Sequence, residues 1–155
     1  MHDKLKNRDL LLCSSCLLIF ALIVRFYTAG PVDSGGDAIY KWWELRKYSE
    51  LNMALPATLW SHHMMRWSIN LPVYFIQNSI SKAPVYIYLF PILCSAISTI
   101  LVFLIIQKVT LRKIVSLTGA VVFTILPQNI LAGGQFFPMG PAVMYLLFAI
   151  LFTLI

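Results

Sequence analysis

The sequence has 155 residues, of which 59% are hydrophobic and 12% charged, and its mean hydropathy is +0.79. A water-soluble domain of this length needs more polar residues to cover its surface, so the composition predicts that lipid is the solvent for much of the chain. The formal net charge of +6 could indicate a nucleic-acid partner. However, the basic residues stand in short groups beside apolar runs, which is typical of membrane-topology signals, and nucleic acid is therefore excluded as the expected partner.

The first apolar run covers residues 10–27 and predicts a transmembrane helix. Lys4, Lys6 and Arg8 precede it, as in a signal peptide, but the run is long for one and no clear small-residue cleavage motif follows. A retained helix is therefore expected. Arg25 lies near its outer end, where its side chain is expected to extend to the interface, with phosphate binding as the alternative role.

Two of the three cysteines, Cys13 and Cys16, lie within this run in a CxxC pattern. The pattern can indicate redox or zinc chemistry. Within an apolar helix, however, the spacing places both thiols on one helix face, and buried cysteines commonly act as small hydrophobic residues. We therefore expect neither a metal site nor a disulfide framework.

Three further apolar runs cover residues 83–107, 114–132 and 138–155. The first two are long enough to cross a hydrocarbon core of about 30 Å. The last is still apolar at Ile155, with no basic or aromatic anchor after it, which predicts a truncated protein. The expected fold is a single all-α membrane domain over residues 1–155, with about four transmembrane helices.

The basic residues also predict an orientation. Lys108, Arg112 and Lys113 lie between the second and third runs, whereas the GGQFF link before the fourth run has no basic residue. By the positive-inside rule, the N-terminus and the link that contains Lys108 face the cytoplasm. The loop over residues 30–82 then faces outward, and the protein is expected to be a multi-pass protein of the plasma membrane.

This outward loop contains much of the polar sequence. From Asp37 onward, apolar residues recur at helical spacing and aromatic residues such as Trp42 are frequent, which predicts a helix in the plane of the interface. Residues 67–80 are interrupted by Pro72 and are too few to cross the membrane. A second interfacial or re-entrant helix is therefore expected there.

A helix, a large outward loop that opens with an acidic residue, and tightly connected later helices together resemble the N-terminal half of the GT-C glycosyltransferases. This superfamily includes protein O-mannosyltransferases and bacterial aminoarabinose and lipid-linked-sugar transferases. The matching residues are Gly36, Asp37, Ala38 and Tyr40, then His63, Arg66 and Pro72, and the segment that runs from Pro127 to Pro138. Members have many more helices, so the resemblance implies that this chain is a part of such a protein.

The resemblance implies that Asp37 is the catalytic residue. An acidic residue in this loop acts as general base or orients the acceptor, which attacks the anomeric carbon of a polyprenyl-phosphate sugar. The alternative is structural, because Ser34 and Asp37 also fit a helix-capping box. Asp33 is a candidate for substrate binding, with a solvated turn residue as the alternative.

His62, His63 and Arg66 are candidates for substrate binding, together with Tyr40. His62 and Arg66 share a helix face at a four-residue spacing, and this cationic pair could hold the phosphate of the donor. The alternative is a cluster that binds anionic lipid headgroups. Zinc would require more ligands than two adjacent histidines provide.

No cofactor is expected. Many GT-C members carry a second acidic or metal-binding residue in the next outward loop, where this sequence offers only Gln135, so a divalent metal lacks support. Pro127 is interpreted as a kink or break near the outer end of the third run.

The predicted function is transfer of a sugar from a polyprenyl-phosphate donor to a glycan, lipid or protein at the outer face of the membrane, with the acceptor unspecified. A non-catalytic remnant or accessory subunit is the first alternative, and a small transporter component is the second. Transporters place ionisable residues within their spans, and here Arg25 is nearly alone in that respect.

Overall fold

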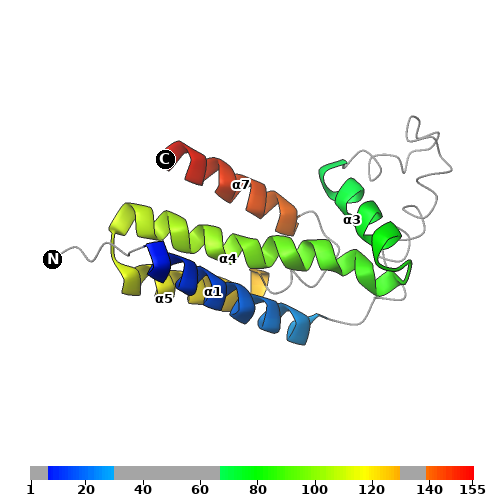
Figure 1. The fold of residues 1–155 in the computed structure, drawn as a ribbon, viewed down its shortest axis with the longest axis horizontal. Coiled ribbons are helices and arrows are strands. Elements are labelled where there is room, and N and C mark those ends of the chain that lie inside the picture. The colour runs from blue at the N-terminus through cyan, green and yellow to red at the C-terminus, as the bar shows by residue number, and fades with distance from the viewer. Residues whose placement is uncertain (1–6, 30–66, 130–138) are drawn as a thin grey trace. The chain divides into compact units, whose positions relative to one another are not determined.

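The computed structural model describes residues 7–29, 67–129 and 139–155, and every element within these ranges is a helix (Figure 1). The predicted all-α class is therefore confirmed for this part of the chain. The chain divides into two compact units, residues 1–29 with 91–155 and residues 30–90.

The helices of the first unit are α1 (Asn7–Thr28), α4 (Leu89–Thr110, of which the first two residues belong to the other unit), α5 (Lys113–Ile125) and α7 (Met139–Leu154). At 1.5 Å per residue, α1 and α4 are each about 33 Å long, whereas α5 is about 20 Å and α7 about 24 Å. Two helices, α1 and α4 with the last residues before it, are thus long and apolar enough to cross a membrane.

The third predicted span differs from the structure. It was expected as one helix over residues 114–132, but α5 ends at Ile125 and Leu126 leaves the helical conformation with φ −58° and ψ 129°. Leu126 precedes Pro127, whose ring disfavours helical geometry in the residue before it. The predicted break at Pro127 is therefore confirmed, and it shortens the helix.

Helix α1 has one buried face. Leu17, Ala21 and Arg25 are its buried residues, each four positions after the last, which places them on one side of the helix. The other sides are apolar and exposed: Leu11 is 70% exposed and Ile23 61%. An apolar residue gains nothing from contact with water, so these sides are suited to lipid.

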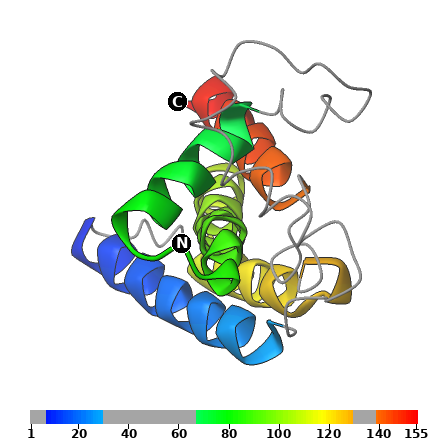
Figure 2. The ribbon, with the colours of Figure 1, turned by 90° about the vertical axis from the view of Figure 1, so that its right-hand side faces the viewer.

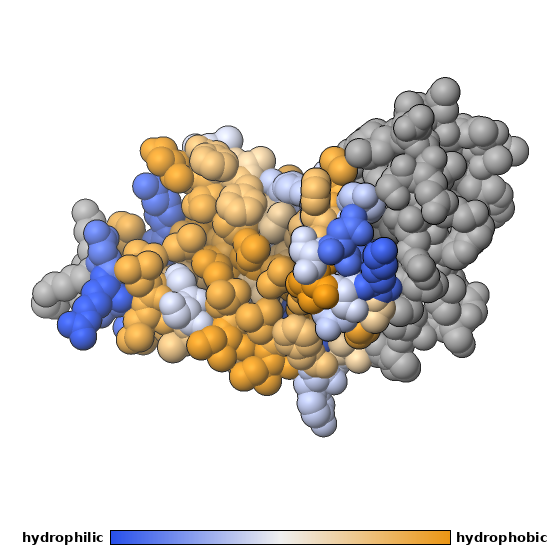
Figure 3. All heavy atoms as spheres, turned by 45° about the vertical axis from the view of Figure 1, so that its right-hand side comes forward, coloured by the Kyte–Doolittle hydropathy of each residue, from blue (hydrophilic) through white to orange (hydrophobic). Residues whose placement is uncertain are grey.

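Helix α4 is the central element, with α1 and α5 on one side and α7 on the other (Figure 2). It buries ten residues, several of them small and polar, and Pro91 lies in its first turn, where no intrahelical N–H bond is lost. Figure 3 shows a mainly apolar surface in the middle of the view, with hydrophilic residues at the left-hand end and again beside the grey residues.

Taken in chain order, the helices of the first unit alternate in direction. The link from α4 to α5 is two residues long, and Leu111 closes it in the left-handed conformation, with φ 55°, while its N–H donates to the Gln107 carbonyl. This turn makes α4 and α5 antiparallel. Helix α1 runs parallel to α5, and α7 runs parallel to α4 (Figure 1).

The three helices α1, α4 and α5 share an apolar core made by Leu17, Phe103 and Ala120, one residue from each helix. Small residues allow the close approach of α5 to α4. A methyl group added at Gly119 would lie 2.5 Å from the Cδ1 atom of Ile106. Close packing through small residues is the usual means by which helices associate in membranes.

The described part of the second unit contains α3 (Trp67–Ser79) and the short 3₁₀ helix η2 (Pro84–Tyr88). The prediction of a helix at 67–80 is confirmed, but the predicted interruption at Pro72 is wrong, because α3 continues through it. Pro72 lies in the second turn and removes one backbone hydrogen bond without ending the helix. Asn70, Val73 and Gln77 form the buried face of α3.

We predict that Gly119→Leu destabilises the first unit by about 1–3 kcal/mol, because its side chain would overlap Ile106. Gly119→Ala should have a smaller effect, since the end of the Ile106 side chain can rotate away. Thr118→Leu, at the neighbouring exposed position, is the matched control. Thermal unfolding in lipid nanodiscs measures all three, and equal stability of Gly119→Leu and the control would contradict the close approach.

Candidate anion site around a buried arginine

The six residues predicted to bind or process the substrate lie outside the described residues. They are Asp33, Asp37, Tyr40, His62, His63 and Arg66, all within residues 30–66, and Gln135 also falls in an undescribed range. The first unit contains a different charged site, built around Arg25.

Arg25 corrects the expectation that its side chain extends to the interface. The residue is 0% exposed and lies among α1, α4 and α5. The reason is the position of Arg25 on the helix. It follows Leu17 by eight residues, which places it on the same face of α1, and this face packs against the other helices. Small residues opposite this position leave room for the guanidinium.

Two hydrogen bonds hold the guanidinium. Arg25 Nε donates to Ser95 Oγ of α4 at 2.7 Å, and Nη1 donates to the carbonyl oxygen of Thr124 in α5 at 2.8 Å. The Thr124 side chain lies 3.0 Å from the Thr99 hydroxyl, and Oγ1 also donates to the Ala120 carbonyl at 2.8 Å. We call Arg25, Ser95, Thr99 and Thr124 the arginine cluster.

The Thr124 carbonyl accepts this bond because α5 ends at Ile125. The last four carbonyls of a helix have no intrahelical donor. Pro127 has no N–H group to offer the Phe123 carbonyl, and the side chain of Asn129 replaces it, with Nδ2 to O at 2.7 Å. The next carbonyl, that of Thr124, receives its donor from Arg25.

Arg25 therefore caps the C-terminus of α5. The unsatisfied carbonyls give this end of a helix a partial charge of about −0.5, which favours a nearby cation. Hydrogen bonding and the helix dipole neutralise the guanidinium in part. A full positive charge in an apolar interior requires more than this.

No carboxylate completes the charge balance within the described residues. Asp9 is the acidic residue of this part of the chain, and it lies sixteen positions before Arg25, about 24 Å along α1. The second terminal nitrogen of Arg25, Nη2, is buried and has no hydrogen-bond partner among the described residues. Its N–H groups are therefore unpaired in this part of the chain.

This arrangement is suited to an anion. The guanidinium is planar and always charged, and its paired N–H groups match the oxygens of a carboxylate or a phosphate. A metal cation would be repelled by the same charge. Within the described ranges, no three His, Cys, Asp or Glu side chains lie close enough to hold a metal ion.

The CxxC cysteines do not form part of this site. Cys13 is half-buried and packs against the apolar core, whereas Cys16 is exposed, and both are free thiols. Their burial thus differs, although their spacing predicted a common face.

A second polar pair lies nearer the other end of α4 and α5. Ser116 Oγ is 2.9 Å from Gln107 Oε1 and 2.8 Å from the carbonyl oxygen of Arg112. The apolar core, including Phe103, lies between this pair and the arginine cluster. An apolar layer therefore separates these two polar groups within the described residues of the first unit.

Within the described residues, the fold and site define a helical protein that has two helices long and apolar enough to cross a membrane and a buried, incompletely paired arginine. The sequence matches no protein family, and neither a curated protein nor a solved structure matches the chain.

The composition of the arginine cluster predicts opposite effects from two substitutions. Arg25→Met should raise the free energy of unfolding by about 1–4 kcal/mol, because a buried charge is replaced by an apolar side chain of similar length. Ser95→Ala should lower it by about 1–3 kcal/mol, because it leaves Arg25 Nε buried without an acceptor. Chemical unfolding in detergent measures both. A large loss of stability in Arg25→Met would indicate a purely structural cap.

Proposed function

We propose that the chain is a membrane module of a GT-C type glycosyltransferase that uses a polyprenyl-phosphate sugar, and that Arg25 binds the phosphate of this lipid. The observation that carries the proposal is the buried Nη2 of Arg25, which has no hydrogen-bond partner among the described residues, whereas Nε and Nη1 each donate one hydrogen bond. Ionisable residues buried among transmembrane helices commonly mark a binding or transport site.

The apolar helices support the membrane part of the proposal. Helices α1 and α4 match the thickness of a hydrocarbon core, and their exposed residues are largely apolar. Four spans would also require α5 and α7 to cross. Each is shorter than about 30 Å, so either neighbouring residues extend them or the bilayer thins locally.

The alternating helix directions support the proposed orientation. Arg8, Lys108 and Lys113 lie at the ends of α1, α4 and α5 that meet on one side of the first unit. With this side in the cytoplasm of a plasma-membrane protein, Arg25 lies near the outer face. The segment from residue 30, which carries Asp37, then begins on that same outer side.

In the proposed reaction, Asp37 accepts the proton of an acceptor hydroxyl as its oxygen attacks the anomeric carbon. The bond between this carbon and the phosphate oxygen breaks, and polyprenyl phosphate leaves with one additional negative charge. A fixed cation at that phosphate lowers the energy of the transition state. Arg25 supplies the cation, while Asp33, Tyr40, His62, His63 and Arg66 are proposed to bind the sugar and acceptor.

The two alternative functions, a transporter component and a non-catalytic remnant or accessory subunit, require different structural features. A transporter component needs a polar route, and the apolar core at Leu17, Phe103 and Ala120 interrupts one through the described part of the first unit. A remnant or accessory subunit needs no base. Phosphate binding at Arg25 together with no effect of Asp37 would favour that alternative.

Our binding prediction concerns Arg25. In nanodiscs, the protein should bind undecaprenyl phosphate at least about tenfold more tightly than undecaprenol, because charge-assisted hydrogen bonds to phosphate contribute about 1.5–3 kcal/mol. Arg25→Met should remove the difference and Arg25→Lys should retain part of it. Lys82→Gln, which removes an exposed charge from the link between α3 and η2, is the matched control. Native mass spectrometry gives the affinities, and equal binding of lipid phosphate and alcohol by the unaltered protein would refute the site.

A second prediction separates catalysis from binding. Asp37→Asn should reduce sugar transfer in native membranes by about 10²- to 10⁴-fold, the usual contribution of a general base, without weakening undecaprenyl phosphate binding. Glu50→Gln is the control for loss of a loop carboxylate. Sugar incorporation from labelled polyprenyl-phosphate sugars is the readout. Unchanged transfer in Asp37→Asn would favour the helix-capping interpretation.

A further inference from the structure

Four basic residues gather where α1 begins, α4 ends and α5 begins. We call this group the basic end: Arg8, Lys108, Arg112 and Lys113. Asp9 is the acidic residue near it in the described part of the chain. The excess positive charge comes from three helix ends and lies opposite to the arginine cluster.

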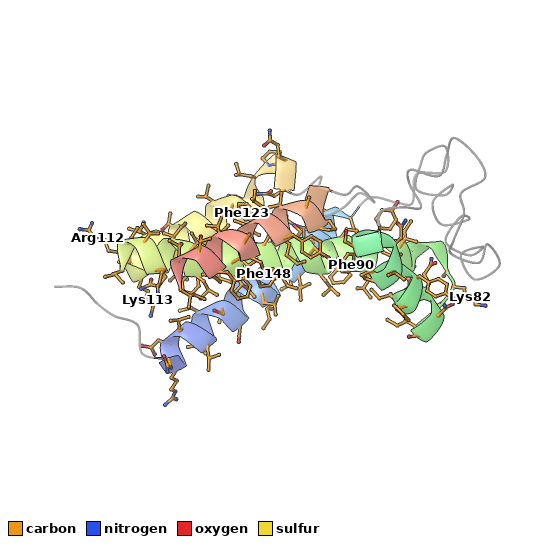
Figure 4. The ribbon with its side chains drawn as sticks, turned by 90° about the horizontal axis from the view of Figure 1, so that it is seen from above. Lys82, Phe90, Arg112, Lys113, Phe123 and Phe148 are labelled. Carbon is orange, nitrogen blue, oxygen red and sulfur yellow. The ribbon has the colours of Figure 1, made fainter. Side chains whose placement is uncertain are left out.

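The register of α1 against α4 brings these ends together. Arg25 of α1 bonds to Ser95 of α4, and Leu17 of α1 shares a core with Phe103 of α4. Leu17 is eight residues before Arg25, and Phe103 is eight residues after Ser95, so the two helices are antiparallel and in step. Continuing this antiparallel register brings Arg8 to the level of Arg112. Figure 4 shows Arg112 and Lys113 at the end of the first unit where α1 starts.

At the basic end, charged side chains lie next to exposed apolar side chains. Arg8, Lys108 and Arg112 are exposed, and Lys113 is half-buried. Next to them, Val109 is 66% exposed and Ile114 is 79% exposed. Basic side chains beside exposed aliphatic ones are suited to the boundary between phosphate headgroups and acyl chains.

The backbone adds donors at the same place. Arg112 is the N-cap residue of α5, and its side chain makes no capping hydrogen bond to the N-terminus of this helix. The first N–H groups of a helix have no intrahelical acceptor, and the positive end of the dipole favours an anion. The basic side chains and these N–H groups therefore both favour the binding of an anion at the basic end.

We propose that the basic end binds the phosphate headgroups of anionic phospholipids such as phosphatidylglycerol. The surface carries four cations against one carboxylate and borders apolar side chains, so it complements a negatively charged headgroup attached to acyl chains. This site is distinct from the proposed polyprenyl-phosphate site, because Arg8 and Arg25 are seventeen residues apart, about 26 Å along α1. It does not depend on any enzymatic activity.

The test uses the full chain in nanodiscs of phosphatidylcholine with increasing phosphatidylglycerol, and measures bound lipid by native mass spectrometry. The fourfold variant Arg8→Gln, Lys108→Gln, Arg112→Gln and Lys113→Gln should lose roughly fivefold in phosphatidylglycerol affinity for each charge removed. A control variant removes the same number of charges from the loop: Lys41→Gln, Arg46→Gln, Lys47→Gln and Lys82→Gln. It should keep its preference. Both leaflets of a nanodisc are accessible, so the result does not depend on orientation.

Three results would overturn the proposal: no preference for phosphatidylglycerol in the unaltered protein, equal losses in the two fourfold variants, or displacement of the lipid by inorganic phosphate. If the fourfold variant does not fold, the double variants Arg8→Gln with Lys108→Gln and Arg112→Gln with Lys113→Gln replace it, each with an expected loss of roughly 25-fold. Arg25→Met should leave the phosphatidylglycerol preference unchanged. That result would separate this site from the proposed function.

Discussion

The hydrogen bond from Arg25 to the Thr124 carbonyl is the interaction that sets the register of α1 against α5 in the first unit. It joins α1 to the C-terminus of α5, and the neighbouring bond to Ser95 joins both helices to α4. Local features of α4 and α5 explain why each hydrogen-bond acceptor of Arg25 is present. Small polar residues on α4 leave space for the guanidinium, and the break before Pro127 frees a carbonyl that a longer helix would have used. The interaction satisfies two of the nitrogens of Arg25 and leaves Nη2 without an acceptor, so the features that hold the helices together also create the candidate site.

The sequence predicted the helical class and the extents of α1 and α4 well, because long apolar runs bounded by basic residues have few other interpretations. It predicted α5 poorly. A hydropathy run continues through Pro127, but a proline lacks the N–H group that a helix uses and disfavours the helical conformation in the residue before it, and Leu126 leaves that conformation. Pro72 shows the opposite error. In α3 the proline lies early enough that only one hydrogen bond is removed, and the helix continues.

The candidate site was predicted in part. Arg25 was recognised as a charge within a span, but its location depended on which face of α1 packs inward, and that face is set by residues far away in the sequence. The partners Ser95, Thr99 and Thr124 were missed. A signal was present, since α4 has small polar residues four apart and α5 has Ser116, Ala120 and Thr124 at the same spacing, which is typical of tightly packed membrane helices. That pattern predicts a contact but does not identify its partner helix.

The order of synthesis has a consequence for Arg25. Thr124 follows it by 99 residues, which a ribosome requires about 5–20 s to add. During this interval α1 carries a charge whose partners do not yet exist, and its lowest-energy state in a bilayer has the side chain at the interface. The short turn at Leu111 joins α4 and α5 as an antiparallel pair, so Ser95 and the Thr124 carbonyl, which both accept from Arg25, lie on adjoining helices. Burial of the arginine thus reports completed assembly of the three helices.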